Sequence, residues 1–260
     1  MVYLGEFKKN GYYLFRNYFS KEELSVVSKI VLEANRNWRE KNDVPENVNS
    51  AYLTSDTFLP GFQNRERLFE FISDRRLVAI AETLIQSKVF FLNTQLFYNP
   101  ISVSKKPYWH RDIQYMGIEE EKQKDIIKED AVLHFRIPFQ EDPGMDFIPG
   151  SHLRWDTDLE RNTRLELNGR RNFEELPNSI RVPHKPGDLL VFSAHLIHKG
   201  VYGLDRSSFD ILYTSFPSSS MEVNRMGHFP NSDSAFFGNP IFETIVSSMN
   251  SEPTSVDRNV

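Results

Sequence analysis

The spacing of apolar residues near the start of the chain predicts helices. Residues 5–16 predict a short helix, a break at Gly11 and the short aromatic strand YYLF. Ser20 and Glu23 have the spacing of a helix-capping box, and apolar residues then recur every three or four positions through 21–38. The first part of the chain is therefore expected to be largely helical.

The pattern changes from helical spacing to short strands after residue 88. Before that point, the polar, asparagine-rich segment 36–50 is typical of a loop, and 65–85 predicts a second long helix. Runs rich in aromatic and β-branched residues then predict strands at 89–100, 108–116, 131–139, 145–152, 207–216 and, around Pro186-Gly187, two within 180–203. The charged run 119–130 is expected to be a solvated loop or short helix, and 155–177 a polar insertion over one face.

Helices followed by closely spaced strands predict an α+β or mainly β domain with helices packed on one side. A chain of 260 residues can bury one substantial core, so we expect a single domain over 1–260. We place its core at about 5–216. From residue 217 on, Ser, Asn and Pro dominate, and 217–260 is predicted to be a tail or lid with little intrinsic order.

Composition excludes several classes of function. With a net charge of −5 and scattered Lys and Arg, nothing in the sequence indicates a nucleic-acid surface, and we expect no nucleic-acid partner. It has no apolar run of membrane-spanning length and no signal-peptide core, so we expect a cytoplasmic protein without membrane partners. The chain has no cysteine, so any metal must be bound by His, Asp, Glu or water. Nothing in the sequence indicates an oligomeric state.

The stretch YWHRDIQY carries His110 and Asp112 two residues apart. On a strand these side chains share a face, and they form either an ordinary His–Asp pair or two-thirds of a metal site. Two His and one carboxylate leave three open positions on an octahedral Fe(II) ion. The third ligand would be His195 or His198, which point to opposite faces of a strand. Spacing alone slightly favours the ordinary pair.

Four separated segments resemble the phytanoyl-CoA dioxygenase family. The family's HxD strand matches YWHRDIQY, its second metal-binding strand GDLLVFSAHLIHKG, its PGSH element FIPGSH, and its N-terminal signature FKKNGYYLFRNYFSKEELSVV. These matches occur in the family's order over roughly residues 5–216. The resemblance implies the metal ligands His110, Asp112 and His198, and it leaves His195 at a non-ligand position.

The resemblance also implies a fold and a chemistry. The fold would be a double-stranded β-helix (jelly roll, cupin-like), mainly β with flanking helices. The family uses Fe(II), the co-substrate 2-oxoglutarate and dioxygen, so we expect hydroxylation, or another oxidation, of a C–H bond in a small metabolite or natural-product intermediate. Thr94 and Gln95 fall where the family places side chains near 2-oxoglutarate, and Tyr115 where a pocket wall is expected. Related halogenases leave the carboxylate position vacant, so Asp112 argues against halogenation.

Two positions depart from the family pattern. Phe209 stands where the family carries the arginine that binds the far carboxylate of 2-oxoglutarate, and Gly200 replaces a serine. Phenylalanine cannot take over a bidentate guanidinium contact. Arg206, in an R-x-S pattern with Ser208, could supply the contact instead, as could Arg136 from a neighbouring strand, or the protein no longer uses 2-oxoglutarate in the usual way. We favour Arg206.

The missing arginine keeps two alternatives open. One is a catalytically silent cupin-like protein that binds a metal or small ligand, and the complete HxD…H triad argues against it. The other is an Fe(II) oxygenase that does not use 2-oxoglutarate. An oxygen-consumption assay with and without 2-oxoglutarate distinguishes this second alternative from the favoured function.

Overall fold

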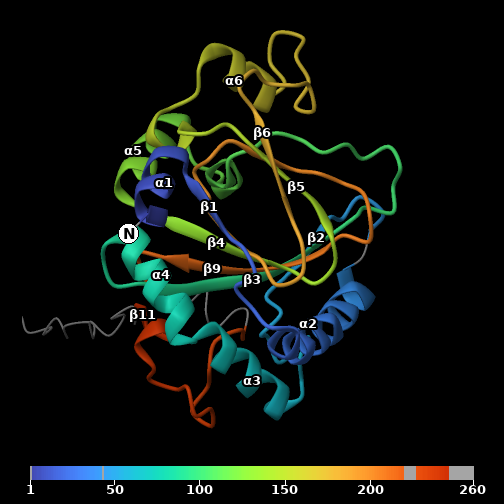
Figure 1. Ribbon diagram of the computed structural model, residues 1–260, viewed down its shortest axis with the longest axis vertical. Coiled ribbons are helices and arrows are strands. Elements are labelled where there is room, and N and C mark those ends of the chain that lie inside the picture. Colours follow the sequence, from blue (N-terminus) through green and yellow to red (C-terminus); the bar gives the residue numbers. More distant parts are fainter. Residues whose placement is uncertain (1, 43, 220–226, 246–260) are drawn as a thin grey trace, which may run out of the picture.

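Two antiparallel sheets form a sandwich in the computed structural model, which describes residues 2–42, 44–219 and 227–245 (Figure 1). The larger sheet has the order β1 (Tyr12–Phe15), β7 (Leu189–Ser193), β4 (Val132–Pro138), β9 (Ser207–Thr214), β3 (Phe90–Tyr98), β2 (Asn49–Ala51). The smaller has the order β6 (Ile180–His184), β5 (Asp142–Phe147), β8 (His198–Gly200). A short parallel pair joins β10 (Ser218–Ser219) to β11 (Thr244–Ile245). The predicted class, a mainly β double-stranded β-helix with flanking helices, is confirmed.

Helices cover the outer face of the larger sheet. Figure 1 shows α2, α3 and α4 on the side of this sheet opposite β5 and β6, with α6 at the far end of the molecule. The helices are α1 (Val2–Asn10), α2 (Lys21–Asn42), α3 (Phe62–Ile72), α4 (Arg75–Ile85), α5 (Glu120–Glu129) and α6 (Asp158–Arg164). Within the described residues, no helix has both the length and the apolar character needed to cross a membrane.

Strand alternation in the larger sheet separates the core from the site. On β9, Phe209, Ile211 and Tyr213 belong to the main apolar core together with residues of α2, α3 and α4. The residues between them, including Asp210, point to the space between the sheets because side chains alternate along a strand. The same alternation places His134 and Arg136 of β4 on the inner face.

The predicted helices form, with different boundaries. Ser20 and Glu23 make the expected capping box, since Ser20 N donates to Glu23 Oε2 at 2.8 Å and Glu23 N donates to Ser20 Oγ at 3.2 Å. The helix continues to Asn42, so the loop predicted at 36–50 is helical in its first part and carries β2 at its end. The single helix predicted over 65–85 is two helices, because Asp74 caps α4 through Arg76 N at 2.8 Å. The charged run forms α5, the short-helix option.

The strand predicted at 108–116 is wrong. Only His110 forms a bridge, with His198, and Asp112–Met116 is a 3-10 helix. The chain leaves the sheet at Arg111, whose buried guanidinium binds Asp156 at 2.7 Å. The segment 145–152 likewise ends its strand at residue 147, and 180–203 forms three strands instead of two, with a turn before His198.

Part of the expected tail packs on the core. Phe229, Ile241 and Phe242 are buried within the main apolar cluster, which differs from the expectation of little order. The stretches 220–226 and 246–260 lie outside the described residues. The division into a core at 5–216 and a tail or lid at 217–260 stays a prediction.

Candidate metal centre

Two backbone hydrogen bonds place two histidines side by side between the sheets. His110 N donates to His198 O and His198 N donates to His110 O, both at 3.0 Å. Their imidazole rings are consequently 4.2 Å apart between centroids. The antiparallel pairing of β8 with β5, in which His198 lies opposite Phe147, holds this bridge in the smaller sheet.

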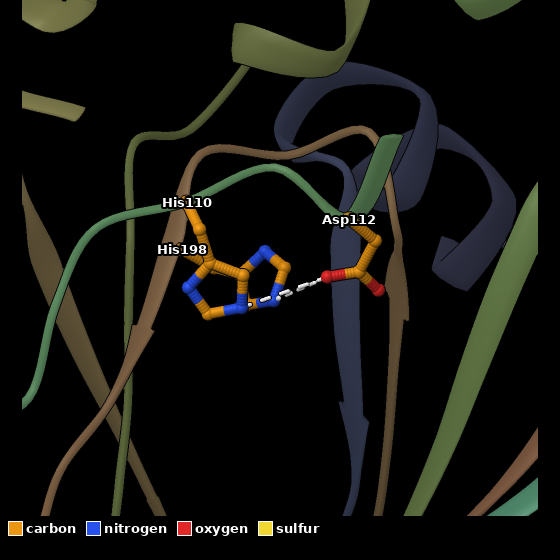
Figure 2. A group of neighbouring side chains, drawn as sticks. All are labelled: His110, Asp112 and His198. Carbon is orange, nitrogen blue, oxygen red and sulfur yellow. Dashed lines mark ion pairs between the residues drawn. The ribbon is translucent and has the colours of Figure 1, made fainter. Parts of the chain in front are cut away.

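A carboxylate completes a three-point group with these histidines (Figure 2). Asp112 Oδ1 lies 3.6 Å from His110 Nε2 and 3.4 Å from His198 Nε2. Two ligand atoms on adjacent corners of an octahedron with bonds of about 2.1 Å are about 3 Å apart, so the separation is close to that of a metal site. Two imidazoles and one carboxylate on one side of an ion are the ligand set of non-haem Fe(II) oxygenases.

Both histidines are prepared to bind a metal through Nε2. His110 Nδ1 donates to Tyr108 O at 3.1 Å, and His198 Nδ1 donates to Leu196 O at 2.9 Å, which leaves each Nε2 lone pair free. Burial lowers the pKa of His198 to about 3 and also lowers the pKa of His110. Both rings are therefore neutral at pH 7, the form that coordinates metals.

The second oxygen of Asp112 is held by His134. His134 Nε2 lies 2.6 Å from Asp112 Oδ2, and its Nδ1 lies 2.8 Å from Asp210 Oδ2. Burial opposes the charge on His134, but the two carboxylates outweigh it and raise its pKa to about 9. Burial likewise opposes ionisation of Asp112, yet His134 and His198 hold the pKa of Asp112 below its usual range. Alternation along the strand predicted at 131–139 puts His134 and Arg136 on one face, but the sequence does not reveal the Asp210 partner.

A cavity of about 470 Å³ opens over the triad. It is lined by four further residues predicted for the site: Gln95, Tyr115, Arg136 and Arg206. Thr94 faces the other side of β3, where it is fully buried and its Oγ1 accepts from Leu53 N at 3.0 Å. Thr94 therefore does not reach the cavity, and we assign it no role in binding. His195 is outside the triad, with its Nε2 2.9 Å from Asp130 O.

The two predicted arginines differ in how far they are already paired. Arg136 makes a bidentate contact with Asp210, Nε to Oδ1 at 2.7 Å and Nη2 to Oδ2 at 2.8 Å. Arg206, which is 4% exposed, donates only its Nε to a carboxylate, Asp142 Oδ2 at 3.3 Å. Among the described residues, no oxygen accepts a hydrogen bond from Nη1 or Nη2 of Arg206. Arg206 thus keeps the pair of donors that a ligand carboxylate requires.

The position where the family carries its arginine faces away from the cavity. Phe209 is fully buried on the helix-covered side of β9, with its ring stacked on Phe139 at 6.0 Å between centroids. An arginine at 209 would enter the apolar core. Ser208 points to the inner side, where its Oγ donates to Asp142 Oδ2 at 2.5 Å. The serine of the R-x-S pattern is therefore already hydrogen-bonded to a carboxylate of the chain itself, that of Asp142.

Fold and site together define a double-stranded β-helix with a two-histidine, one-carboxylate group inside it. The chain belongs to the phytanoyl-CoA dioxygenase family, whose model, Phytanoyl-CoA dioxygenase (PhyH), matches residues 7–201. The match includes the three proposed ligands and ends before Arg206. No curated protein matches the chain.

Solved structures of similar fold include three enzymes. The nogalamycin-biosynthesis epimerase SnoN, described as non-heme and alpha ketoglutarate dependent, is 19% identical over 82% of this chain and 81% of its own, with a TM-score of 0.55. The carbocyclase SnoK of the same biosynthesis is 15% identical over 82% and 83%, with a TM-score of 0.57. EctD from S. alaskensis, with bound 2-oxoglutarate and 5-hydroxyectoine, is 18% identical over 81% and 74%, with a TM-score of 0.57. Identities this low establish a shared fold alone.

Proposed function

We propose that the protein is a non-haem Fe(II) and 2-oxoglutarate-dependent dioxygenase that hydroxylates a C–H bond of a small metabolite or natural-product intermediate. The observation that carries the proposal is the group of His110, Asp112 and His198 beneath a cavity of about 470 Å³. Family membership supports it. Further support comes from SnoN, solved with Fe3+, alpha ketoglutarate and nogalamycin RO, and from EctD, solved with 2-oxoglutarate.

Each residue of the triad has a defined part in this function. The ion would be held by Nε2 of His110, Nε2 of His198 and Oδ1 of Asp112, because the other nitrogen or oxygen of each is already hydrogen-bonded. Bound Fe(II) would supply oxidation of the substrate by dioxygen, coupled to decarboxylation of 2-oxoglutarate. His134 occupies Asp112 Oδ2, which favours binding through one oxygen and leaves three positions open on the ion.

Two of the cavity residues contact 2-oxoglutarate in this proposal, and two others form the walls of the cavity. Arg206 binds the far carboxylate of 2-oxoglutarate through Nη1 and Nη2, the donors without an oxygen partner among the described residues. Gln95 offers its amide to the same ligand from β3. Arg136 is neutralised by Asp210 and forms part of the wall. Tyr115, 59% exposed beside His110, forms the substrate side of the cavity.

One observation favours a second candidate, an Fe(II) oxygenase that does not use 2-oxoglutarate. Asp142 already binds both Arg206 and Ser208, the two residues that would otherwise receive an external carboxylate. In that case Asp142 would occupy the co-substrate's place. The complete triad argues against a catalytically silent metal-binding protein.

Oxygen consumption and succinate formation by the iron-loaded protein test the proposal. We expect 2-oxoglutarate to be required for oxygen uptake, even during slow uncoupled turnover without substrate. Asp112→Ala should abolish both signals because the ion loses its only carboxylate ligand, whereas His195→Gln, outside the triad, should retain them. Oxygen uptake that does not depend on 2-oxoglutarate would support the second candidate. Activity retained in Asp112→Ala would exclude both.

A further inference from the structure

We infer that Gly200 and Asp142 are positioning residues that seat Arg206 as the anchor for the co-substrate carboxylate. The inference rests on the proposed function. It adds an account of how Arg206, three residues before the family's arginine position, is held in place. Gly200 supplies space for the guanidinium, and Asp142 fixes its Nε edge. Neither residue has a role in the metal triad.

Gly200 lies directly against the guanidinium of Arg206. A Cβ at position 200 would be 2.7 Å from Nη2, 3.3 Å from Cζ and 3.4 Å from Nη1. The backbone of Gly200 is not in the left-handed region, so this residue is not required for its conformation. The absence of a side chain matters here because it lets the planar end of Arg206 lie on the backbone of β8.

Asp142 is held firmly enough to orient an arginine. This carboxylate is 3% exposed, and its Oδ1 accepts from Gly144 N at 2.8 Å. Its Oδ2 accepts from Ser208 Oγ at 2.5 Å and from Arg206 Nε at 3.3 Å, and His184 Nε2 lies 3.4 Å away. Burial opposes ionisation, but His184 and Arg206 hold the pKa of Asp142 below its usual range.

A bulge in β5 aims this carboxylate at the arginine. The pairing of β5 with β6 shifts register between Asp142 and Met145. Gly144 within the bulge has a φ of +116°, and a Cβ there would be 2.4 Å from Val182 O, so glycine is required at this point. The direction of Asp142 is therefore set by the backbone of the smaller sheet and does not depend on Arg206.

Holding the Nε edge leaves Nη1 and Nη2 for a ligand. A carboxylate can accept two parallel hydrogen bonds from this pair, which is the strong geometry for a guanidinium. Asp142 also balances the charge of a buried arginine when no ligand is bound, which lowers the cost of keeping the cation there. The two departures from the family pattern, the arginine at 206 instead of 209 and the glycine at 200 instead of a serine, then have one explanation. The guanidinium of Arg206 lies across position 200, where a serine side chain would collide with it.

The test is calorimetric titration of 2-oxoglutarate into the full-length protein loaded with Mn(II), which avoids turnover. Four proteins form a double-mutant cycle: wild type, Gly200→Ala, Arg206→Ala and the double variant. Gly5→Ala is the matched control, because a Cβ at Gly5 would have no atom within 4 Å. Asp142→Ala extends the same measurement to the second positioning residue.

We expect Gly200→Ala to weaken 2-oxoglutarate binding at least tenfold, and Asp142→Ala to weaken it as well. In the Arg206→Ala background Gly200→Ala should have no further effect, because the group that it displaces is gone. The melting temperature and Mn(II) affinity of Gly200→Ala should stay close to those of the wild type, since the flexible end of Arg206 can move aside.

Each adverse outcome has a distinct meaning. If the wild-type Mn(II) protein fails to bind 2-oxoglutarate, the proposed function itself is contradicted. If wild type binds it but Gly200→Ala binds equally well, or loses as much affinity without Arg206 as with it, the positioning role is overturned and the proposed function stands. If Asp142→Ala does not fold, the double-mutant cycle of Gly200 and Arg206 still tests the positioning role.

Discussion

His134 connects Asp112 of the triad to Arg136 in the wall of the cavity. It contacts Asp112 on one side and Asp210 on the other, and Asp210 in turn binds Arg136. The grouping of His110, Asp112 and His198 was predictable because these residues stand at the ligand positions of the family motif. The His134–Asp210 contact was not, because it joins residues 76 positions apart and depends on how β4 and β9 align. The same holds for Gly200, whose role is visible only with Arg206 against it.

Replacing His134 should weaken metal binding although it is not a ligand. We expect His134→Gln to reduce Fe(II) or Mn(II) affinity by about 10–100-fold, because partners that orient a ligand typically contribute that much. Anaerobic metal titration measures the change. His195→Gln is the matched control, a buried histidine outside the triad whose Nε2 faces a backbone carbonyl. An unchanged affinity in His134→Gln would show that Asp112 does not need this support.

Along strand β9, side chains alternate between the helix-covered core and the space between the sheets, and only those on the second side can reach the cavity. The sequence predicted β9 well but could not show that position 209 faces the core, because counting from a motif ignores the length of the loop before the strand. The prediction of one helix over 65–85 was wrong because apolar spacing continues across the break between α3 and α4, where Asp74 caps α4. The strand predicted around His110 failed because Arg111 draws the chain out of the sheet.

Moving the anchor to the family's usual position should therefore fail. In the double variant Arg206→Ala/Phe209→Arg, the new guanidinium would enter the helix-covered core at a site that is fully buried. Burying an unpaired charge should lower the free energy of unfolding by more than about 3 kcal/mol. Urea unfolding measures this loss, with Arg206→Ala alone as the control. A stable double variant that binds 2-oxoglutarate would show that our orientation of β9 is wrong.

For the whole molecule, the sandwich and the buried part of the C-terminal segment form one core. Phe229 and Phe242 pack on Phe91 of the larger sheet, with ring centroids 5.3 and 5.5 Å apart. Composition suggested disorder here because Ser, Asn and Pro dominate, but a few large aromatic residues are sufficient to attach the segment. Beside this contact lies His228, whose pKa burial lowers to about 4.

Stability of the metal-free protein should fall as the pH drops below about 6.5. Burial lowers the pKa of His228 and His152 to about 4, and that of His198 to about 3. The unfolded chain takes up a proton at each near pH 6.5 while the folded chain does not, so acid favours unfolding. We expect a loss of at least about 2 kcal/mol between pH 7 and pH 5.

Urea unfolding at several pH values measures this dependence. His228→Phe, which keeps an aromatic ring beside Phe91 and Phe229, should flatten the dependence by the contribution of one histidine. A free energy of unfolding that stays constant between pH 7 and pH 5 would mean that these histidines are protonated in the folded state.

The central claim is most directly tested by anaerobic titration of the metal-free protein, first with Fe(II) and then with 2-oxoglutarate, followed by visible absorption. Chelation of 2-oxoglutarate to ferrous iron at His110, Asp112 and His198 should produce a weak charge-transfer band that saturates. The band should be lost in Asp112→Ala. If iron binds and no band forms with the wild-type protein, 2-oxoglutarate is not the co-substrate and the proposed chemistry is wrong.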